Sequence, residues 1–262
     1  MSERDVLARE LAYHERLYSG FAQSHFARPA VRALRAHIVR RILRMTGAGP
    51  ASRVLSLGCG IGDTELLLAP HVREVVGVDL SPAAIRQARA DAARLRIANA
   101  RFEEGSSASG VFDVAIAIFF LHHLSDEALA ALPPRLRTLL APGGVFYSLD
   151  PSRRRLSGAI GRVLVPRLMK RYQTEDEREL DAGPVAQLFR AFDFEARAAT
   201  YDFGSSPLAG LFPGWRFGYR AARLVDDCLL RTPLRALGSN FEIIARAPNP
   251  GSTGGQQAFD RS

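Results

Sequence analysis

The alternation of short apolar segments with amphipathic ones is the feature that most constrains the fold. Apolar runs of strand length are separated by segments with helical periodicity near residues 64–69, 81–96 and 125–140. Alternation at this spacing predicts a parallel β-sheet covered by helices on both faces. Two more strands are expected after this region, which makes an α/β fold with a seven-stranded sheet. The expected strands are residues 53–57, 74–79, 100–103, 112–119, 145–149, 194–203 and 241–245.

Proline and glycine mark where several of these elements begin or end. Ser81-Pro82 supplies an N-cap and a proline at the first helical position. Pro133-Pro134 is expected to interrupt the helix over residues 125–140. Pro142-Gly143-Gly144 is expected to form a turn into the fifth strand.

The chain is predicted to divide into a helical cap, one large domain and a tail. Residues 1–49 contain two segments of helical periodicity, Val6–Tyr18 and Val31–Ile42. Residues 50–248 form the α/β domain, with insertions at about residues 152–183 and 205–240 that leave from the carboxyl edge of the sheet. Residues 249–262 are rich in Gly, Ser and Gln and are expected to be a disordered tail.

Composition narrows the cellular location of the protein and the classes of partner that it binds. The two cysteines, Cys59 and Cys228, lie far apart, no apolar run approaches the roughly 20 residues of a membrane span, and the first residues do not resemble a secretory signal. These features predict a cytoplasmic protein. The net charge of +8 comes from arginines spread along the chain, with a single lysine, which disfavours nucleic-acid binding. The run at residues 153–155 is compatible with contact to an anionic membrane surface, although a solvated charge run is the commoner case.

A glycine-rich turn follows the first strand and carries the clearest functional signal. Gly58, Gly60 and Gly62 stand at alternate positions between the strand and a helix, so a ligand can approach the backbone closely. Seventeen residues after Gly62, Asp79 ends the second strand, where a carboxylate can accept hydrogen bonds from a ribose diol. Together the two features predict binding of an adenosine-containing cofactor.

The spacing of the turn distinguishes between such cofactors. A dinucleotide-binding turn has the pattern G-x-G-x-x-G, and here Asp63 occupies the place of its third glycine. An aspartate is repelled by a pyrophosphate but attracted to a cationic sulfonium and an amino group. The charge therefore favours S-adenosylmethionine over NAD.

Residues 53–150 resemble the class I S-adenosylmethionine-dependent methyltransferases. The resemblance is carried, in order, by Leu-Gly-Cys-Gly-Ile-Gly, Gly-Val-Asp-Leu-Ser, Phe-Asp-Val-Ala-Ile-Ala, Leu-His-His-Leu and Leu-Ala-Pro-Gly-Gly-Val-Phe. It implies a Rossmann-like fold and S-adenosylmethionine as the cofactor. It also implies that Gly58, Gly60 and Gly62 border the methionine part of the cofactor, Asp79 holds the ribose, Leu80 lies against the adenine, and Phe119 lies near the methyl group.

The chain departs from the family pattern at two positions. Ser56 stands where the family usually has an acid, two residues before the first glycine, and Asp63 is a candidate to compensate for it. Gly105-Ser106 replaces a Gly-Asp pair that binds the adenine amino group. Both departures leave a hydrogen-bonding group without charge. Cys59, inside the turn, is counted with the cofactor-binding residues and is expected to be a buried filler rather than a nucleophile.

His122 and His123 follow the fourth strand and are the candidate catalytic residues. A neutral histidine there can accept a proton from a hydroxyl acceptor, whereas the alternative is that one histidine only packs under the next helix. No metal site is expected. The predicted activity is methyl transfer by in-line displacement to a small hydrophobic or aromatic acceptor, such as a lipid or quinone precursor. The alternatives are a cofactor-binding regulatory protein without turnover and an NAD-dependent oxidoreductase.

Overall fold

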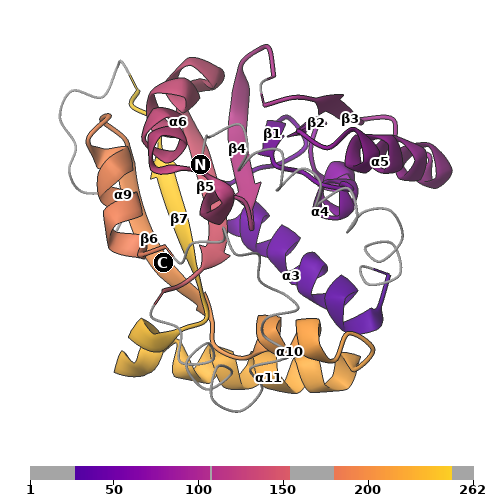
Figure 1. Ribbon diagram of the computed structural model, residues 1–262, viewed down its shortest axis with the longest axis vertical. Coiled ribbons are helices and arrows are strands. Elements are labelled where there is room, and N and C mark those ends of the chain that lie inside the picture. The colour runs from indigo at the N-terminus through magenta and orange to yellow at the C-terminus, as the bar shows by residue number, and fades with distance from the viewer. Residues whose placement is uncertain (1–26, 107, 154–179, 250–262) are drawn as a thin grey trace, which may run out of the picture.

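A seven-stranded sheet forms the centre of the fold (Figure 1). The computed structural model describes residues 27–106, 108–153 and 180–249. The expected first helix, most of the 152–183 insertion and all but the first residue of the expected tail lie outside these residues. The strand order is β3-β2-β1-β4-β5-β7-β6. The strands are β1 (Arg53–Leu57), β2 (Glu74–Asp79), β3 (Ala100–Glu104), β4 (Phe112–Ile118), β5 (Leu140–Pro151), β6 (Glu195–Asp202) and β7 (Asn240–Arg246).

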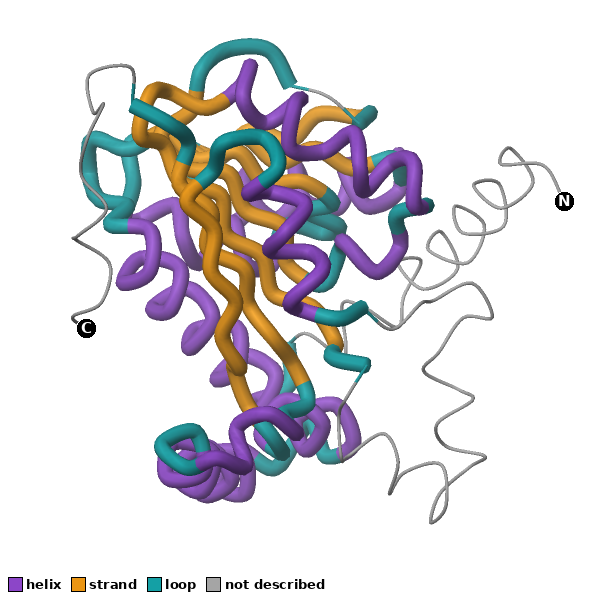
Figure 2. The backbone as a smooth tube through the Cα atoms, turned by 90° about the vertical axis from the view of Figure 1, so that its left-hand side faces the viewer, coloured by secondary structure: helices purple, strands orange, loops and turns teal. Residues whose placement is uncertain are grey.

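Helices cover both faces of the sheet, as the alternation predicted. One face is covered by α3 (Pro29–Thr46), α4 (Asp63–Leu68) and α5 (Pro82–Leu95), and the other by α6 (Asp126–Leu139) and α9 (Ala182–Arg190). Figure 2 shows the sheet between these layers. Short 3₁₀ helices lie at η2 (Ala69–His71), η3 (Leu121–His123) and η4 (Pro233–Leu237). The α/β class and the seven strands are therefore confirmed.

The last strand runs against the others. Strands β1 to β5 pair in parallel, whereas β7 is antiparallel to both β5 and β6. Strand β6 ends and β7 begins at the same carboxyl edge, so the segment that joins them stays at that edge. This segment contains α10 (Ser205–Leu211) and α11 (Arg216–Leu229), which lie side by side at the bottom of Figure 1.

Two expected breaks lie inside continuous elements. Helix α6 runs through Pro133 and Pro134 without interruption, because its apolar face continues on both sides and packs into the core. Pro142-Gly143-Gly144 lies within β5 and not in a separate turn, with a register shift opposite Phe112 and Val114. Gly143 there has a φ of +74°. The proline and glycine signals mark a local irregularity, and the packed neighbours decide that the element continues.

None of the helices in the described ranges is long and apolar enough to cross a membrane.

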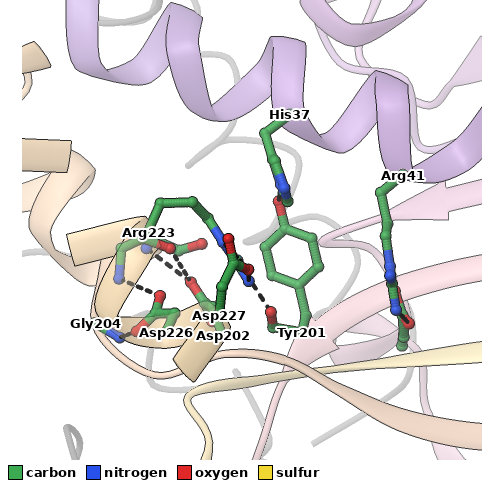
Figure 3. Close-up of polar contacts among 11 residues, drawn as sticks. His37, Arg41, Tyr201, Asp202, Gly204, Arg223, Asp226 and Asp227 are labelled. Carbon is green, nitrogen blue, oxygen red and sulfur yellow. Dashed lines mark hydrogen bonds and ion pairs between the residues drawn. The ribbon is translucent and has the colours of Figure 1, made fainter. Parts of the chain in front are cut away.

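An ion pair with a buried carboxylate joins helix α3 to strands β5 and β7. Arg41 donates through Nε to Oε2 of Glu242 on β7 at 2.9 Å and forms a second contact with Oε1, while the Tyr147 hydroxyl donates to Oε2 at 3.0 Å. Glu242 is completely buried, so each of its oxygens depends on these partners. Figure 3 shows Arg41 on α3 beside His37, which meets the Tyr201 hydroxyl at 2.7 Å.

We expect Arg41→Ala to lower the free energy of unfolding by about 3–5 kcal/mol, because it leaves the Glu242 carboxylate buried without its cation. Urea denaturation followed by circular dichroism measures this change. Arg44→Ala, an exposed position on the same helix, serves as the control and should change little. If Arg41→Ala were as stable as Arg44→Ala, the pair would have no structural role.

Candidate functional site

The turn between β1 and α4 has a backbone that favours glycine at three positions. Gly58, Gly60 and Gly62 have φ values of +65°, +53° and +75°, in the left-handed region. A Cβ at Gly62 would lie 2.7 Å from the Phe102 ring. The three glycines predicted to form the turn therefore lie in a backbone conformation that would be strained with any other residue.

A cavity of about 170 Å³ borders this turn at the carboxyl edge. Its walls come from α3, the turn, the first residues of α4 and the end of β4. The lining residues are Arg35, Gly58, Cys59, Gly60, Ile61, Asp63, Thr64, Glu65, Ile118 and Phe119. Five of the residues predicted to bind a cofactor are among them.

Asp79 ties the glycine turn to the end of β2. Its Oδ2 accepts from the Gly60 N–H at 2.8 Å, and its Oδ1 accepts from the Ser81 N–H at 2.9 Å. The Gly105 N–H donates to the Asp79 carbonyl at 2.9 Å. The ends of β1, β2 and β3 therefore meet at Asp79. A carboxylate has about four acceptor sites, so two further hydrogen bonds can still be accepted.

Glu65 is a functional candidate that the sequence reasoning missed. It lies in the first turns of α4, is almost completely buried, and lines the cavity. Its Oε1 accepts from the Ser56 hydroxyl at 2.6 Å, while Oε2 has no hydrogen-bond partner among the described residues. Burial raises the pKa of Glu65 to about 7, partly opposed by the Ser56 hydrogen bond, with repulsion from Asp63 adding to the rise. The Glu65 carboxyl of α4 thus lies beside Ser56, the residue that replaces the acid usual in the family.

Asp63 forms an ion pair with an arginine at the cavity wall. Its Oδ2 lies 2.7 Å from Nε of Arg35 on α3, and Arg35 also donates to the Thr64 hydroxyl at 3.3 Å. Arg35 therefore offsets the charge of Asp63 at the cavity wall. Because the two residues are 28 positions apart, no local pattern could have indicated this pair.

The other residues predicted to bind the cofactor range from exposed to buried. Leu80 is 47% exposed and Ser106 is exposed, while the Ser106 carbonyl contacts the Arg135 guanidinium. Gly105 has a φ of +127°. Cys59 is buried, and burial raises the pKa of its thiol well above the usual value, which agrees with a filler and not a nucleophile.

Phe119 has an unusual backbone at the cavity wall. Its φ is +55°, a left-handed conformation that costs a residue with a bulky side chain about 1–3 kcal/mol. Its N–H donates to the Leu149 carbonyl at 2.7 Å, which holds the end of β4 against β5. The Arg35 guanidinium lies 5.7 Å from the centre of the Phe119 ring. Phe119 and Arg35 thus face each other across this part of the wall.

His122 and His123 lie side by side in η3, with ring centres 4.0 Å apart. The Nδ1 of His122 is 3.0 Å from Oδ1 of Asp150, at the end of β5, and the His122 N–H contacts the same oxygen at 3.3 Å. Asp150 is completely buried, which raises the pKa of its carboxyl, and the bond to His122 acts in the opposite direction. His122 itself is only 7% exposed. Asp150, a second residue missed from the sequence, therefore fixes the His122 ring.

Within the described ranges, no group of three His, Cys, Asp or Glu side chains could hold a metal ion.

The chain is similar in sequence to known methyltransferases. A family profile described as a methyltransferase domain matches residues 54–144. Trans-aconitate 2-methyltransferase of Methylobacterium radiotolerans is 32% identical over 188 residues, which cover 70% of this chain and 67% of the relative. Ubiquinone biosynthesis O-methyltransferase of Acinetobacter baylyi is 25% identical over 155 residues, covering 56% and 64%. The chain spans about half the length of three other curated methyltransferases that it matches (48%, 40% and 58%).

The fold has solved counterparts as well. The structure of the DhpI–SAH complex superposes with a TM-score of 0.60 at 16% identity, covering 95% of this chain and all of that one. At this identity the likeness concerns the fold alone. The fold, the glycine turn and the extent of the match to the trans-aconitate enzyme establish that this chain belongs to the class I S-adenosylmethionine-dependent methyltransferases.

Proposed function

We propose that this protein transfers a methyl group from S-adenosylmethionine to a small hydrophobic or aromatic acceptor. The observation that carries the proposal is the cavity at the glycine turn, where a buried carboxylate, Glu65, has one oxygen without a partner among the described residues. A buried, unpaired carboxylate oxygen at a cavity wall favours a cationic ligand, because an opposite charge stabilises the ionised form. S-adenosylmethionine carries two such charges, a sulfonium and an ammonium.

The residues around the turn fit the parts of this cofactor. We assign the ammonium group to Glu65, in place of the family acid that Ser56 replaces. The ribose diol is assigned to Asp79, which has acceptor capacity left after binding the Gly60 and Ser81 N–H groups. The adenine is assigned to the surface formed by Leu80 and Gly105-Ser106. Phe119, at the end of β4, is assigned to the wall near the methyl group.

Methyl transfer requires little of the protein beyond alignment of the acceptor with the methyl group of the cofactor. The cofactor, when bound, supplies an activated methyl group that an acceptor atom attacks in line. The cavity walls exclude water, and the ends of β1, β2 and β4 hold the reacting groups in one orientation. Such positioning provides a large part of the rate enhancement in reactions of this type.

A histidine base is a secondary part of the proposal. The Asp150 carboxylate accepts from Nδ1–H of His122 in the tautomer that leaves Nε2 free to accept a proton. Since His122 is almost buried, only the edge of its ring, or the adjacent His123, can meet an acceptor hydroxyl. We therefore assign His122 and Asp150 mainly to positioning the end of β4.

We expect His122→Asn and His123→Asn each to keep the rate of methyl transfer within about ten-fold of the wild type, because alignment and not proton removal limits the reaction. The measurement is single-turnover formation of S-adenosylhomocysteine, with cofactor affinity determined in parallel. A drop of about 10²–10⁴ at unchanged cofactor affinity would instead assign general-base catalysis to that histidine.

The surface near the site and one relative support the proposed acceptor class. The carboxyl edge carries the apolar segment that contains α10 and α11, and one relative is a ubiquinone biosynthesis O-methyltransferase. We propose a quinone or lipid precursor as the acceptor. The test is incubation of the protein with radiolabelled S-adenosylmethionine and a panel of phenolic and lipid-like compounds. Cofactor binding without S-adenosylhomocysteine production on any acceptor or cell extract would favour the regulatory alternative, and binding of NADH would favour an oxidoreductase.

A further inference from the structure

Exposed apolar side chains are concentrated on one segment at the carboxyl edge. Eight of the eleven large apolar residues that are exposed in the described part of the chain lie between residues 211 and 237. Scattered exposed apolar residues are normal, but a contiguous group marks a surface that contacts something. The eight residues are Leu211, Phe212, Trp215, Phe217, Leu224, Val225, Leu234 and Leu237.

Helix α11 is partly inverted relative to an ordinary surface helix, because its buried side carries Arg223 and Asp226 beside Tyr219, which packs in the core. Arg223 is buried and donates through Nη1 to the Tyr201 carbonyl at 3.1 Å and through Nη2 to Oδ1 of Asp227 at 2.6 Å. The buried Asp226 carboxylate accepts from the N–H groups of Gly204 and Ser205, both at 3.0 Å. Figure 3 shows these groups together on the side of α11 that faces the sheet.

The outer side of α11 is apolar along its length. Phe217, Leu224 and Val225 are 76%, 69% and 57% exposed and recur at helical spacing. Trp215 lies directly before the helix and packs its ring against Gly218, while Phe212 meets Trp215 edge-on. We call Phe212, Trp215, Phe217, Leu224 and Val225 the apolar stripe. Turning the helix over to bury the stripe would break the hydrogen bonds of Arg223 and Asp226 on its inner side.

The charges that flank the stripe are positive. Arg216, Arg220 and Arg231 are exposed beside it. The only acids between residues 205 and 240 are Asp226, which is buried, and Asp227, which is bound by Arg223. An apolar stripe flanked by exposed arginines has the pattern of a helix that lies in the plane of an anionic bilayer surface.

The stripe is also joined to the candidate cofactor cavity. The Pro213 carbonyl, in the turn between α10 and α11, accepts from the Ala30 N–H at the start of α3 at 2.8 Å. Arg35 lines the cavity five residues further along α3, a rise of about 7 Å. The surface and the cavity therefore lie on the same edge and share one rigid helix.

We propose that the apolar stripe and its arginines bind the protein to the surface of an anionic lipid bilayer. Apolar side chains enter the boundary between headgroups and acyl chains, and the arginines contact the lipid phosphates. This binding does not depend on the proposed methyl transfer, since it involves neither the cofactor nor an acceptor. It would bring the carboxyl edge to the place where a hydrophobic acceptor is dissolved.

The test is sedimentation of the full chain with vesicles of phosphatidylglycerol and phosphatidylcholine, and with vesicles of phosphatidylcholine alone. We expect binding to the anionic vesicles that weakens with salt, and little binding to the neutral ones. Phe217→Ser with Leu224→Ser should lower the partition coefficient at least ten-fold. Arg216→Gln with Arg220→Gln should lower it about thirty-fold at low salt. Leu95→Ser, an equally apolar exposed site at the end of α5, is the matched control and should bind as the wild type does.

Three further measurements decide between occupants of the stripe. Unchanged thermal unfolding of the Phe217/Leu224 variant supports an uncovered surface, whereas a large drop would mean that another part of the chain covers it and would overturn the proposal. Analytical ultracentrifugation that shows a dimer lost in this variant, without vesicle binding, would also overturn it in favour of a second copy. S-adenosylmethionine affinity, measured by calorimetry on the same variants, should be unchanged, so that a failure of lipid binding is distinguished from a failure of the proposed function.

Discussion

Asp79→Ala should weaken S-adenosylmethionine binding by about 10²–10⁴-fold. The carboxylate is assigned two charge-assisted hydrogen bonds to the ribose diol, each worth about 1.5–3 kcal/mol. Isothermal titration calorimetry measures the loss directly. The substitution also removes the acceptor for the Gly60 and Ser81 N–H groups, so loosening of the turn contributes to the effect.

A ligand without one ribose hydroxyl separates loss of the ribose contact from loosening of the turn. S-adenosylhomocysteine that lacks the ribose 2′-hydroxyl should bind the wild type more weakly than the normal compound does. With Asp79→Ala the two compounds should bind equally, because the partner of that hydroxyl is gone. Equal penalties for the missing hydroxyl in both proteins would contradict the ribose assignment. Ser81→Ala, which removes only the N-cap bond to the Ala84 N–H, controls for disturbance of α5 and should leave binding nearly unchanged.

The fold was predictable because its signals are local. The strand runs and the N-cap at Ser81 depend on residues near one another in the chain, and the positive φ values at Gly58, Gly60 and Gly62 explain why only glycine suits that turn. Pro133 and Pro134 show the limit of such signals. Their local preference to end a helix is outweighed by the apolar face of α6, which packs on both sides of them.

Apart from the local contact between Glu65 and Ser56, the contacts of the site that sequence reasoning missed join distant segments. The pairing of Asp63 with Arg35 joins two helices, and the pairing of His122 with Asp150 joins the ends of two strands. The inverted face of α11 has the same origin. The amino-acid sequence does not indicate which face of this helix is buried, and Arg223 and Asp226 turn inward because they find buried partners on β6 and at the start of α10. The hydrogen-bonded burial of these two side chains, together with the packing of Tyr219 in the core, fixes the orientation of the helix.

Glu65→Gln should lower S-adenosylmethionine affinity and at the same time stabilise the free protein at alkaline pH. The binding loss is expected to be about 10–100-fold at pH 8, since a neutral amide replaces the carboxylate assigned to the ammonium group. At pH 6 the loss should be smaller, because the wild-type carboxyl, with a pKa of about 7, is then mostly protonated. The affinity of the wild type should accordingly rise between pH 6 and pH 8.

The stability of the free protein should change in the opposite direction. The pKa of Glu65 is about 7 in the folded state and near the ordinary 4.5 when unfolded, so the folded state binds more protons between these values. Stability contributed by this group is therefore present below about pH 4.5 and lost as pH rises through 7. Glutamine cannot ionise, so the variant should match the wild type near pH 4.5 and exceed it at pH 8 by up to about 3 kcal/mol. Urea denaturation at a series of pH values measures the difference.

Three ligands identify which group Glu65 contacts. S-adenosylhomocysteine keeps the ammonium but lacks the sulfonium charge, and 5′-methylthioadenosine lacks both. If Glu65 binds the ammonium, Glu65→Gln weakens S-adenosylmethionine and S-adenosylhomocysteine alike and leaves 5′-methylthioadenosine unaffected. Ser56→Ala should act through the same carboxylate, because loss of the Ser56 hydrogen bond raises the pKa of Glu65 further and moves the pH dependence of S-adenosylmethionine affinity to higher pH. If the Gln variant weakened 5′-methylthioadenosine as strongly as the other two, Glu65 would shape the turn and not bind the ammonium group.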